Sequence, residues 1–175
     1  MNTRRAAVLF CISTIIALGG CSTATEGVPQ QAPTGTDEGK VVIRNPKQIS
    51  DKLDCAKTAP ADAVGKAVGA TVVPDTQGVN TGSCAYKVPA SGSVKVDGLV
   101  TASVITHPEG AKTAEFEGNT AFEYREGDKQ CDTAVAVAKN MWLRSHMLLY
   151  SGGDVCAKSK TLLKTMMDAL PKDAS

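Results

Sequence analysis

Apolar and polar residues alternate along several short segments of the chain, and a period of two predicts β-strands. Residues 83–88 alternate in this way, 99–107 are rich in β-branched residues, and 120–125 form a further predicted strand. Shorter apolar runs at 41–43 and 71–73 predict two brief extended segments. The central part of the chain is therefore expected to build a sheet.

The strongest pattern is a pair of alternating runs, 131–138 and 141–150, on either side of Lys139 and Asn140. Asparagine tolerates the positive φ of a tight turn, so these runs predict a β-hairpin. Successive side chains of a strand point to opposite faces. One face of the second run carries the apolar residues Met141, Leu143, Met147 and Leu149. The other face carries Trp142, Arg144, His146, Leu148 and Tyr150.

Helices are predicted before and after these strands. The first has Thr58 as its cap, Pro60 in its first turn and Gly69 at its end. A short helix is expected at 109–117. The last helix begins after Asp154, and its apolar residues recur at intervals of three and four. These residues are Leu162, Leu163, Met166, Met167 and Leu170.

The order of these elements predicts an α+β fold. Strands follow one another as hairpins, without the regular strand–helix alternation of a parallel sheet. We expect a mainly antiparallel sheet of about five to six strands, with two or three helices packed on it and two disulfides.

The N-terminus has the layout of an export signal. Arg4 and Arg5 precede an apolar run over 6–18, which is too short to span a bilayer because about 20 residues are needed. The following Leu18-Gly19-Gly20-Cys21 resembles the lipobox of bacterial lipoproteins. This resemblance implies that the Cys21 thiol receives a diacylglyceryl group and that the chain is cut before it. The alternative is that Cys21 is merely a small residue near an ordinary secretory cleavage site.

The chain divides into three predicted regions. Residues 1–20 form the signal peptide, 21–40 the lipidated cysteine and a flexible tether, and 41–175 a single α+β domain. Residues 22–40 are rich in Gly, Pro, Ser, Thr and Gln and have almost nothing to bury. A flexible coil of this length spans about 25 Å, enough to lift the domain off the lipid headgroups. We therefore expect the protein at the extracytoplasmic face of the cell membrane.

Six cysteines fit that location. Cys11 leaves with the signal and Cys21 is lipidated, which leaves four cysteines in an oxidising compartment. Four cysteines allow three pairings, and the sequence does not choose among them. We favour Cys55–Cys84 and Cys131–Cys156, because each would join a strand to the start of a neighbouring helix. A zinc site is disfavoured because the chain has no C-x-x-C pair.

The order of these cysteines and the motifs around them resemble a known family. The motifs are Asp54-Cys55 to Val68-Gly69, Ser83-Cys84-Ala85-Tyr86, Gly118-Asn119-Thr120-Ala121-Phe122, the strand opening at Cys131, and Asp154-Val155-Cys156 to Leu170-Pro171. Over about residues 41–171 the chain is similar to the actinobacterial lipoproteins grouped as a domain of unknown function. Tyr86 stands where that family often has tryptophan. The resemblance implies location and cross-links, with no catalytic residues to transfer.

Charge and motifs exclude several classes of function. The chain has 19 basic and 18 acidic residues, and removal of 1–20 takes two arginines and no acid, so the mature charge is −1. This balance does not indicate nucleic-acid binding. The sequence has no G-x-S-x-G nucleophile motif, no phosphate-binding glycine loop and no calcium-loop spacing. We therefore predict a protein that is not an enzyme and uses no cofactor or metal.

One group of residues is a candidate recognition surface. The residues are Trp142, Arg144, His146 and Tyr150, a composition favoured at interfaces. The alternative is that this face is covered and that Trp142 fills core space. The leading hypothesis is an envelope lipoprotein that binds an envelope protein or a small apolar ligand through this face. A second is a carrier of lipid or another apolar molecule, with room left at Ala102, Ala134 and Ala136, although these alanines also suit close packing. An envelope enzyme is the third.

Overall fold

A computed structural model describes residues 40–76, 82–90, 96–108, 112–151 and 153–173. The predicted signal peptide, Cys21 and the tether up to residue 39 lie outside the described residues. Within the described ranges, every helix is too short or too polar to cross a membrane.

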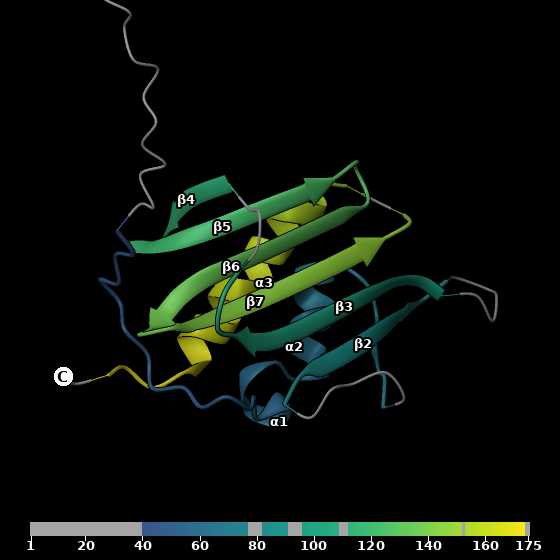
Figure 1. Cartoon of the computed structure of the whole chain (residues 1–175). Helices are drawn as coiled ribbons and strands as arrows, with labels where there is room; N and C mark the ends of the chain where they lie inside the picture. The colour runs from purple at the N-terminus through teal and green to yellow at the C-terminus, as the bar shows by residue number, and fades with distance from the viewer. Residues whose placement is uncertain (1–39, 77–81, 91–95, 109–111, 152, 174–175) are drawn as a thin grey trace, which may run out of the picture. The chain divides into compact units, whose positions relative to one another are not determined.

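The described chain forms one seven-stranded, fully antiparallel sheet with the order β1-β2-β3-β7-β6-β5-β4 (Figure 1). The strands are β1 (Val73–Pro74), β2 (Cys84–Pro89), β3 (Val96–Ile105), β4 (Lys112–Phe116), β5 (Asn119–Glu126), β6 (Gln130–Ala138) and β7 (Met141–Leu149). The α+β class and the antiparallel sheet are confirmed. The number of strands is higher than the predicted five to six.

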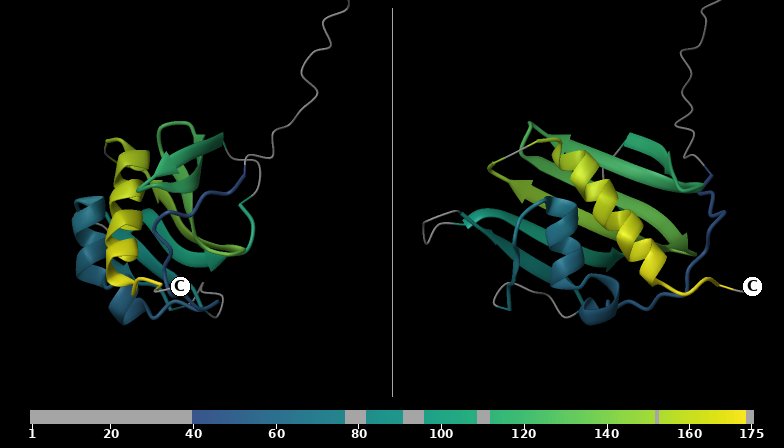
Figure 2. Two further views of the ribbon diagram at one scale, coloured as in Figure 1. Left: turned by 90° about the vertical axis from the view of Figure 1, so that its left-hand side faces the viewer. Right: turned by 180° about the vertical axis from the view of Figure 1, so that it is seen from behind.

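Three helices, α1 (Cys55–Thr58), α2 (Ala61–Val68) and α3 (Val155–Ala169), cover one face of this sheet (Figure 2). We call this the helix face and the opposite side the outer face. Leu143 and Met147 of β7 meet the apolar side of α3, and all of these side chains are almost fully buried. The predicted cap of α3 is confirmed, because the Asp154 side chain accepts hydrogen bonds from the backbone N–H groups of Cys156 and Ala157.

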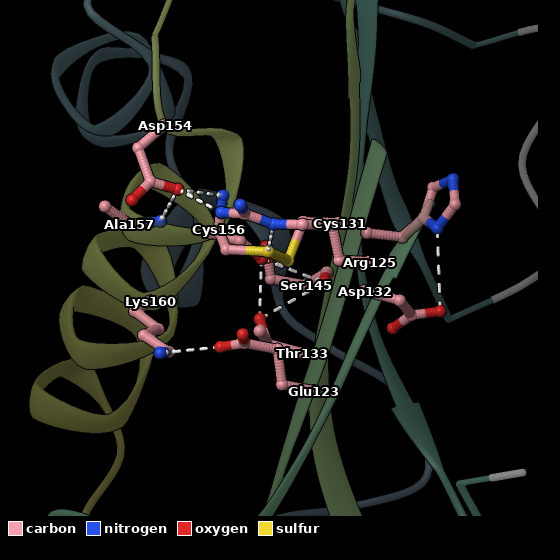
Figure 3. Close-up of a disulfide and its surroundings, with 12 residues drawn as sticks. Glu123, Arg125, Cys131, Asp132, Thr133, Ser145, Asp154, Cys156, Ala157 and Lys160 are labelled. Atoms are coloured by element: carbon pink, nitrogen blue, oxygen red, sulfur yellow. Dashed lines mark hydrogen bonds and ion pairs between the residues drawn. A yellow bond between two sulfur atoms is a disulfide. The ribbon is translucent and has the colours of Figure 1, made fainter. Parts of the chain in front are cut away.

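The favoured cysteine pairing is confirmed. Cys55 at the start of α1 is joined to Cys84 at the start of β2, and Cys131 of β6 to Cys156 in the first turn of α3. Figure 3 shows the second disulfide between the helix and the sheet. Beside it, three buried hydroxyl groups hydrogen-bond one another and connect α3 to β6 and β7. They belong to Thr133, Ser145 and Ser159.

The β6–β7 hairpin is confirmed, and it contains a feature that was not predicted. Asn140 has a φ of 58°, as the tight turn requires. A bulge between Ala136 and Ala138 then shifts the register by one residue. Beyond the bulge the cross-strand pairs are Ala136↔Trp142, Ala134↔Arg144 and Asp132↔His146.

The predicted short helix at 109–117 is wrong. Residues 112–116 form the edge strand β4, which pairs with β5 through a tight turn, and 109–111 lie outside the described residues. The turn residues Glu117 and Gly118 have φ values of 51° and 79°. Both values are left-handed, so the chain reverses here instead of continuing as a helix.

Two local predictions before β2 are also corrected. Thr58 does not cap the first long helix: it is the buried last residue of α1, and α2 starts after Pro60 without a side-chain cap. The end of that helix is confirmed, since Gly69 is left-handed with a φ of 76°. Of the predicted extended segment at 71–73, only Val73 belongs to a strand, the two-residue β1 that it forms with Pro74.

Residues 40–50, which we call the strap, run past the start of β5 and the end of β6. Instead of the expected strand, the strap makes an isolated bridge between Ile43 and Asn119. The backbone N–H of Thr120 donates to the Val42 carbonyl, and the N–H of Lys47 donates to the Val137 carbonyl. The strap thus pairs with the ends of both strands.

Candidate functional site

The outer face of the sheet holds a pocket of about 220 Å³. Its lining residues are Ile105, His107, Pro108, Phe122, Tyr124, Asp132, Ala134 and Arg144. Residues 106–108, which follow the end of β3, pass in front of this face (Figure 1), and His107 and Pro108 are among them. The pocket therefore lies between the sheet and residues 106–108.

The hollow exists because a small residue stands between two large ones. Phe122, Ala134 and Arg144 lie opposite one another on β5, β6 and β7. Neighbouring strands are about 4.8 Å apart, so side chains of one row stand side by side on the same face. The methyl group of Ala134 leaves space between the phenyl ring of Phe122 and the guanidinium of Arg144. Tyr124 follows Phe122 on the same side of β5.

An ion pair fixes the position of Arg144. Its Nε lies 2.9 Å from both carboxylate oxygens of Asp132, and its Nη2 also donates to Asp132. Planar two-point contacts of this kind are the strong form of the arginine–carboxylate pair. The guanidinium is half-buried and held by the strand register, so it is already in place before any ligand arrives.

His146 lies near the same carboxylate, beside the Oδ2 atom that Arg144 also contacts. Its Nδ1 is 3.5 Å from Asp132 Oδ2, longer than an ordinary hydrogen bond, and this buried atom has no closer partner among the described residues. Burial alone would raise the pKa of Asp132, but the neighbouring His146 imidazole and Arg144 guanidinium outweigh it and hold that pKa below its ordinary value. Asp132 is therefore a carboxylate at neutral pH.

The structure brings only part of the predicted recognition surface together. Arg144 and His146 meet at Asp132. Tyr150 is 55% exposed, but it follows the end of β7 and does not line the pocket.

Trp142 is not an accessible contact. Only 5% of it is exposed, and it packs on Ala134 and Ala136 with Ile43 of the strap beside it. Its ring meets the edge of Phe122 at 5.0 Å between ring centres. The alternative interpretation of Trp142, as a residue that fills core space, is correct.

Several lining residues escaped the sequence analysis. Asp132, Phe122 and Tyr124 lie on strands that were predicted, but their shared location depends on which strands are neighbours. Of the three alanines considered as sources of space, Ala134 lines the pocket, while Ala136 lies in the Trp142 cluster and Ala102 in the helix-face core. The room left by Ala134 is on the outer face, not between sheet and helices.

Neutralising Asp132 should destabilise the protein in a pH-dependent way. Asp132→Asn removes a half-buried partner of Arg144, and we expect the free energy of unfolding at pH 7 to fall by about 2 kcal/mol. Because the pKa of Asp132 is lowered by folding, its stabilising contribution is present above the unfolded pKa of about 4 and is lost as the pH falls through the folded value. Urea unfolding at pH 7 and pH 3 measures this. The exposed Asp128→Asn is the control; a constant difference between Asp132→Asn and the unmodified protein at both pH values would contradict the prediction.

Within the described residues, no cluster of three or more His, Cys, Asp or Glu side chains could hold a metal ion. Comparison with known proteins finds no matching family model, no matching curated protein and no matching solved structure. The resemblance to the actinobacterial lipoproteins remains a prediction. The function is therefore proposed from the sequence and from the geometry of this pocket.

Proposed function

We propose that the protein is a lipid-anchored extracytoplasmic lipoprotein that acts as a binding module, with the outer-face pocket as its binding site. The observation that carries the proposal is the pocket itself, in which an aromatic wall faces an arginine held in place by Asp132. A rigid polar group beside exposed aromatic surface is typical of recognition sites.

The location is supported by the N-terminal sequence and by the disulfides. The charged, apolar and small residues before Cys21 follow the order of a lipoprotein signal. Two disulfides in the described domain fit an oxidising compartment. Two or more acyl chains make such an anchor durable. Mass analysis of the mature N-terminus should find a chain that starts at Cys21 and carries diacylglyceryl, unchanged in Cys11→Ser; an unmodified thiol at Cys21 would overturn the anchor.

Binding is favoured over catalysis by the state of Asp132. With a lowered pKa, this residue has no proton to give as a general acid near neutral pH. Its charge is also neutralised by Arg144, which weakens it as a base. The arrangement instead holds Arg144 still, which reduces the entropy lost when a ligand contacts it.

Site-specific photocrosslinking tests the binding site. A photoreactive phenylalanine analogue replaces Tyr124, which is 46% exposed on the pocket wall, in the full chain in its own envelope. The matched control replaces Val73, which is 49% exposed on the edge strand β1. We expect a crosslinked product from position 124 only, and we expect it to disappear when Ala134→Leu fills the pocket.

Either of two outcomes would count against the proposal. Equal products from both positions would mean collisional labelling of an exposed surface. A product at position 124 that persists in Ala134→Leu would mean that the pocket is not what binds. Urea unfolding of Ala134→Leu must give a midpoint close to that of the unmodified protein, so that loss of folding is not mistaken for loss of binding.

A further inference from the structure

We propose that the outer-face pocket takes one neutral sugar ring, either free or as a unit of a longer glycan. This inference rests on the proposed binding function and names the chemistry of its ligand. It follows from three properties of the lining: its charge balance, its hydrogen-bonding groups and its apolar wall.

The charges in the pocket cancel. Arg144 is the cation of the lining and Asp132 the anion, and the two are paired with each other. An anionic ligand such as a phosphate would have to compete with Asp132 for the guanidinium, and a cationic ligand would have to compete with Arg144 for the carboxylate. A neutral ligand meets neither penalty.

The hydrogen-bonding groups suit hydroxyls. A guanidinium has five N–H donors, and Arg144 directs its Nε and one Nη2 hydrogen at Asp132, which leaves three donors. The Asp132 carboxylate has about four lone-pair sites, of which the two Arg144 hydrogens occupy at least two, and the Tyr124 hydroxyl both donates and accepts. A hydroxyl group also both donates and accepts. Adjacent hydroxyls of a sugar can therefore bond the arginine and the carboxylate together.

The opposite wall suits the C–H face of a sugar ring. Phe122 and Tyr124 stand next to each other on one face of β5, and Ile105 at the end of β3 and Pro108 just after it add apolar surface. Aromatic faces carry negative potential and attract the positive edge of C–H groups. The volume of about 220 Å³ lies below the roughly 300–1,000 Å³ of drug-sized sites, which suits a ligand as small as one sugar ring.

Amide NMR titration of the full chain, in lauryldimethylamine oxide micelles that carry no sugar headgroup, tests this. The probes are methyl α-D-glucoside, methyl α-D-mannoside, methyl β-D-galactoside and N-acetylglucosamine, each raised to about 100 mM. A single sugar ring makes few contacts, so we expect saturable shifts at Phe122, Ala134 and Arg144 with a Kd of a few millimolar. Inorganic phosphate and decanoate are the comparison probes.

Two variants separate the pocket from the rest of the outer face. Ala134→Leu should weaken sugar binding at least tenfold, because the added side chain occupies the hollow. Ala85→Leu, on the same face but three strands away on β2, should bind as the unmodified protein does. Arg144→Lys should also weaken binding severalfold, because an ammonium lacks the planar donors.

The outcomes distinguish the ligand class from the binding function. A sugar that binds the unmodified chain and Ala85→Leu, and not Ala134→Leu, supports the proposal. If phosphate or decanoate shifts the pocket resonances and no sugar does, the sugar inference is wrong and the proposed binding function still stands. Sugar binding that survives in Ala134→Leu would place the sugar elsewhere and overturn the inference. No pocket shift with any probe, together with no crosslink at position 124, would overturn both.

Discussion

Replacing Asn119 with leucine should lower the free energy of unfolding by about 4 kcal/mol. The Asn119 side chain is fully buried and makes four hydrogen bonds. Its Oδ1 accepts from the backbone N–H groups of Arg44 and Asn45, each at 2.8 Å, and its Nδ2 donates to the carbonyls of Asn45 and Ala136 at 3.1 and 2.8 Å. A buried backbone group left without a partner costs about 1–3 kcal/mol. The bond to the Ala136 carbonyl is buried and the three bonds to the strap are half-buried, so the four losses together should come to about 4 kcal/mol. Leucine has a similar size, so the loss is one of hydrogen bonding.

Urea unfolding measures this loss, and the chain offers a matched control. Asn140 is an exposed asparagine in the β6–β7 turn with a φ of 58°, so Asn140→Gly should change stability by less than about 0.5 kcal/mol. The strap should also loosen in Asn119→Leu, and trypsin should cut after Arg44 and Lys47 faster than in the unmodified protein. Equal unfolding midpoints for Asn119→Leu and the unmodified protein would contradict the role given to this side chain.

Removing the Cys131–Cys156 disulfide should lower the free energy of unfolding by about as much as Asn119→Leu does. Opening a loop of 25 residues lowers stability by about 3.5 kcal/mol on the loop-entropy estimate. Both cysteines are buried, so the double variant Cys131→Ala/Cys156→Ala also leaves space in the core. Cys156 Sγ further accepts a hydrogen bond from Arg125 Nε at 3.4 Å.

The second disulfide provides the comparison. Cys55–Cys84 closes a loop of similar length, 29 residues, but Cys55 is only half-buried. We expect the free energy of unfolding of Cys55→Ala/Cys84→Ala to fall by the loop-entropy contribution alone, about 3.5 kcal/mol. That of Cys131→Ala/Cys156→Ala should fall by about 1 kcal/mol more, because this double variant also leaves a cavity in the core. Thermal or urea unfolding of the two double variants decides this. A larger loss for Cys55→Ala/Cys84→Ala would contradict the view that the α3 link is the more important one.

The local sequence pattern was enough to predict most helices and strands. It failed where a segment's structure is decided by residues far away in the sequence. The 131–150 hairpin, the final helix and the Gly69 end of α2 follow from residues that are close in the sequence. The helix expected at 109–117 failed because an edge strand is selected by its pairing with β5. Ser159 is a polar residue on the buried, apolar side of α3, and the sequence gives no reason for it. In the structure its hydroxyl group hydrogen-bonds Thr133 and Ser145 on the sheet, so it is not left without a partner.

Asn119 shows the same division. In the sequence it is an ordinary polar residue after glycine, between the helix predicted at 109–117 and the strand predicted at 120–125. Its four hydrogen bonds join positions up to 75 residues apart, so no local sequence pattern predicts them. Trp142 is similar, because its burial depends on Ile43 of the strap and Phe122 of β5.

In the pocket, the sequence determines which side chains share a face of one strand, and the tertiary structure determines which strands bring them together. Period two already places Arg144 and His146 on one face of their strand, and Phe122 with Tyr124 on one face of another. A simple two-residue turn at Lys139 and Asn140 would put Asp132 opposite Met147, on the helix face. The bulge before Ala138 moves the register by one residue, which turns every β6 side chain to the other face of the sheet and brings Asp132 to His146 and Arg144. The carbonyls at the bulge accept hydrogen bonds from distant parts of the chain, that of Val137 from the Lys47 N–H and that of Ala136 from the Asn119 side chain, so no single stretch of sequence contains all the groups that meet there.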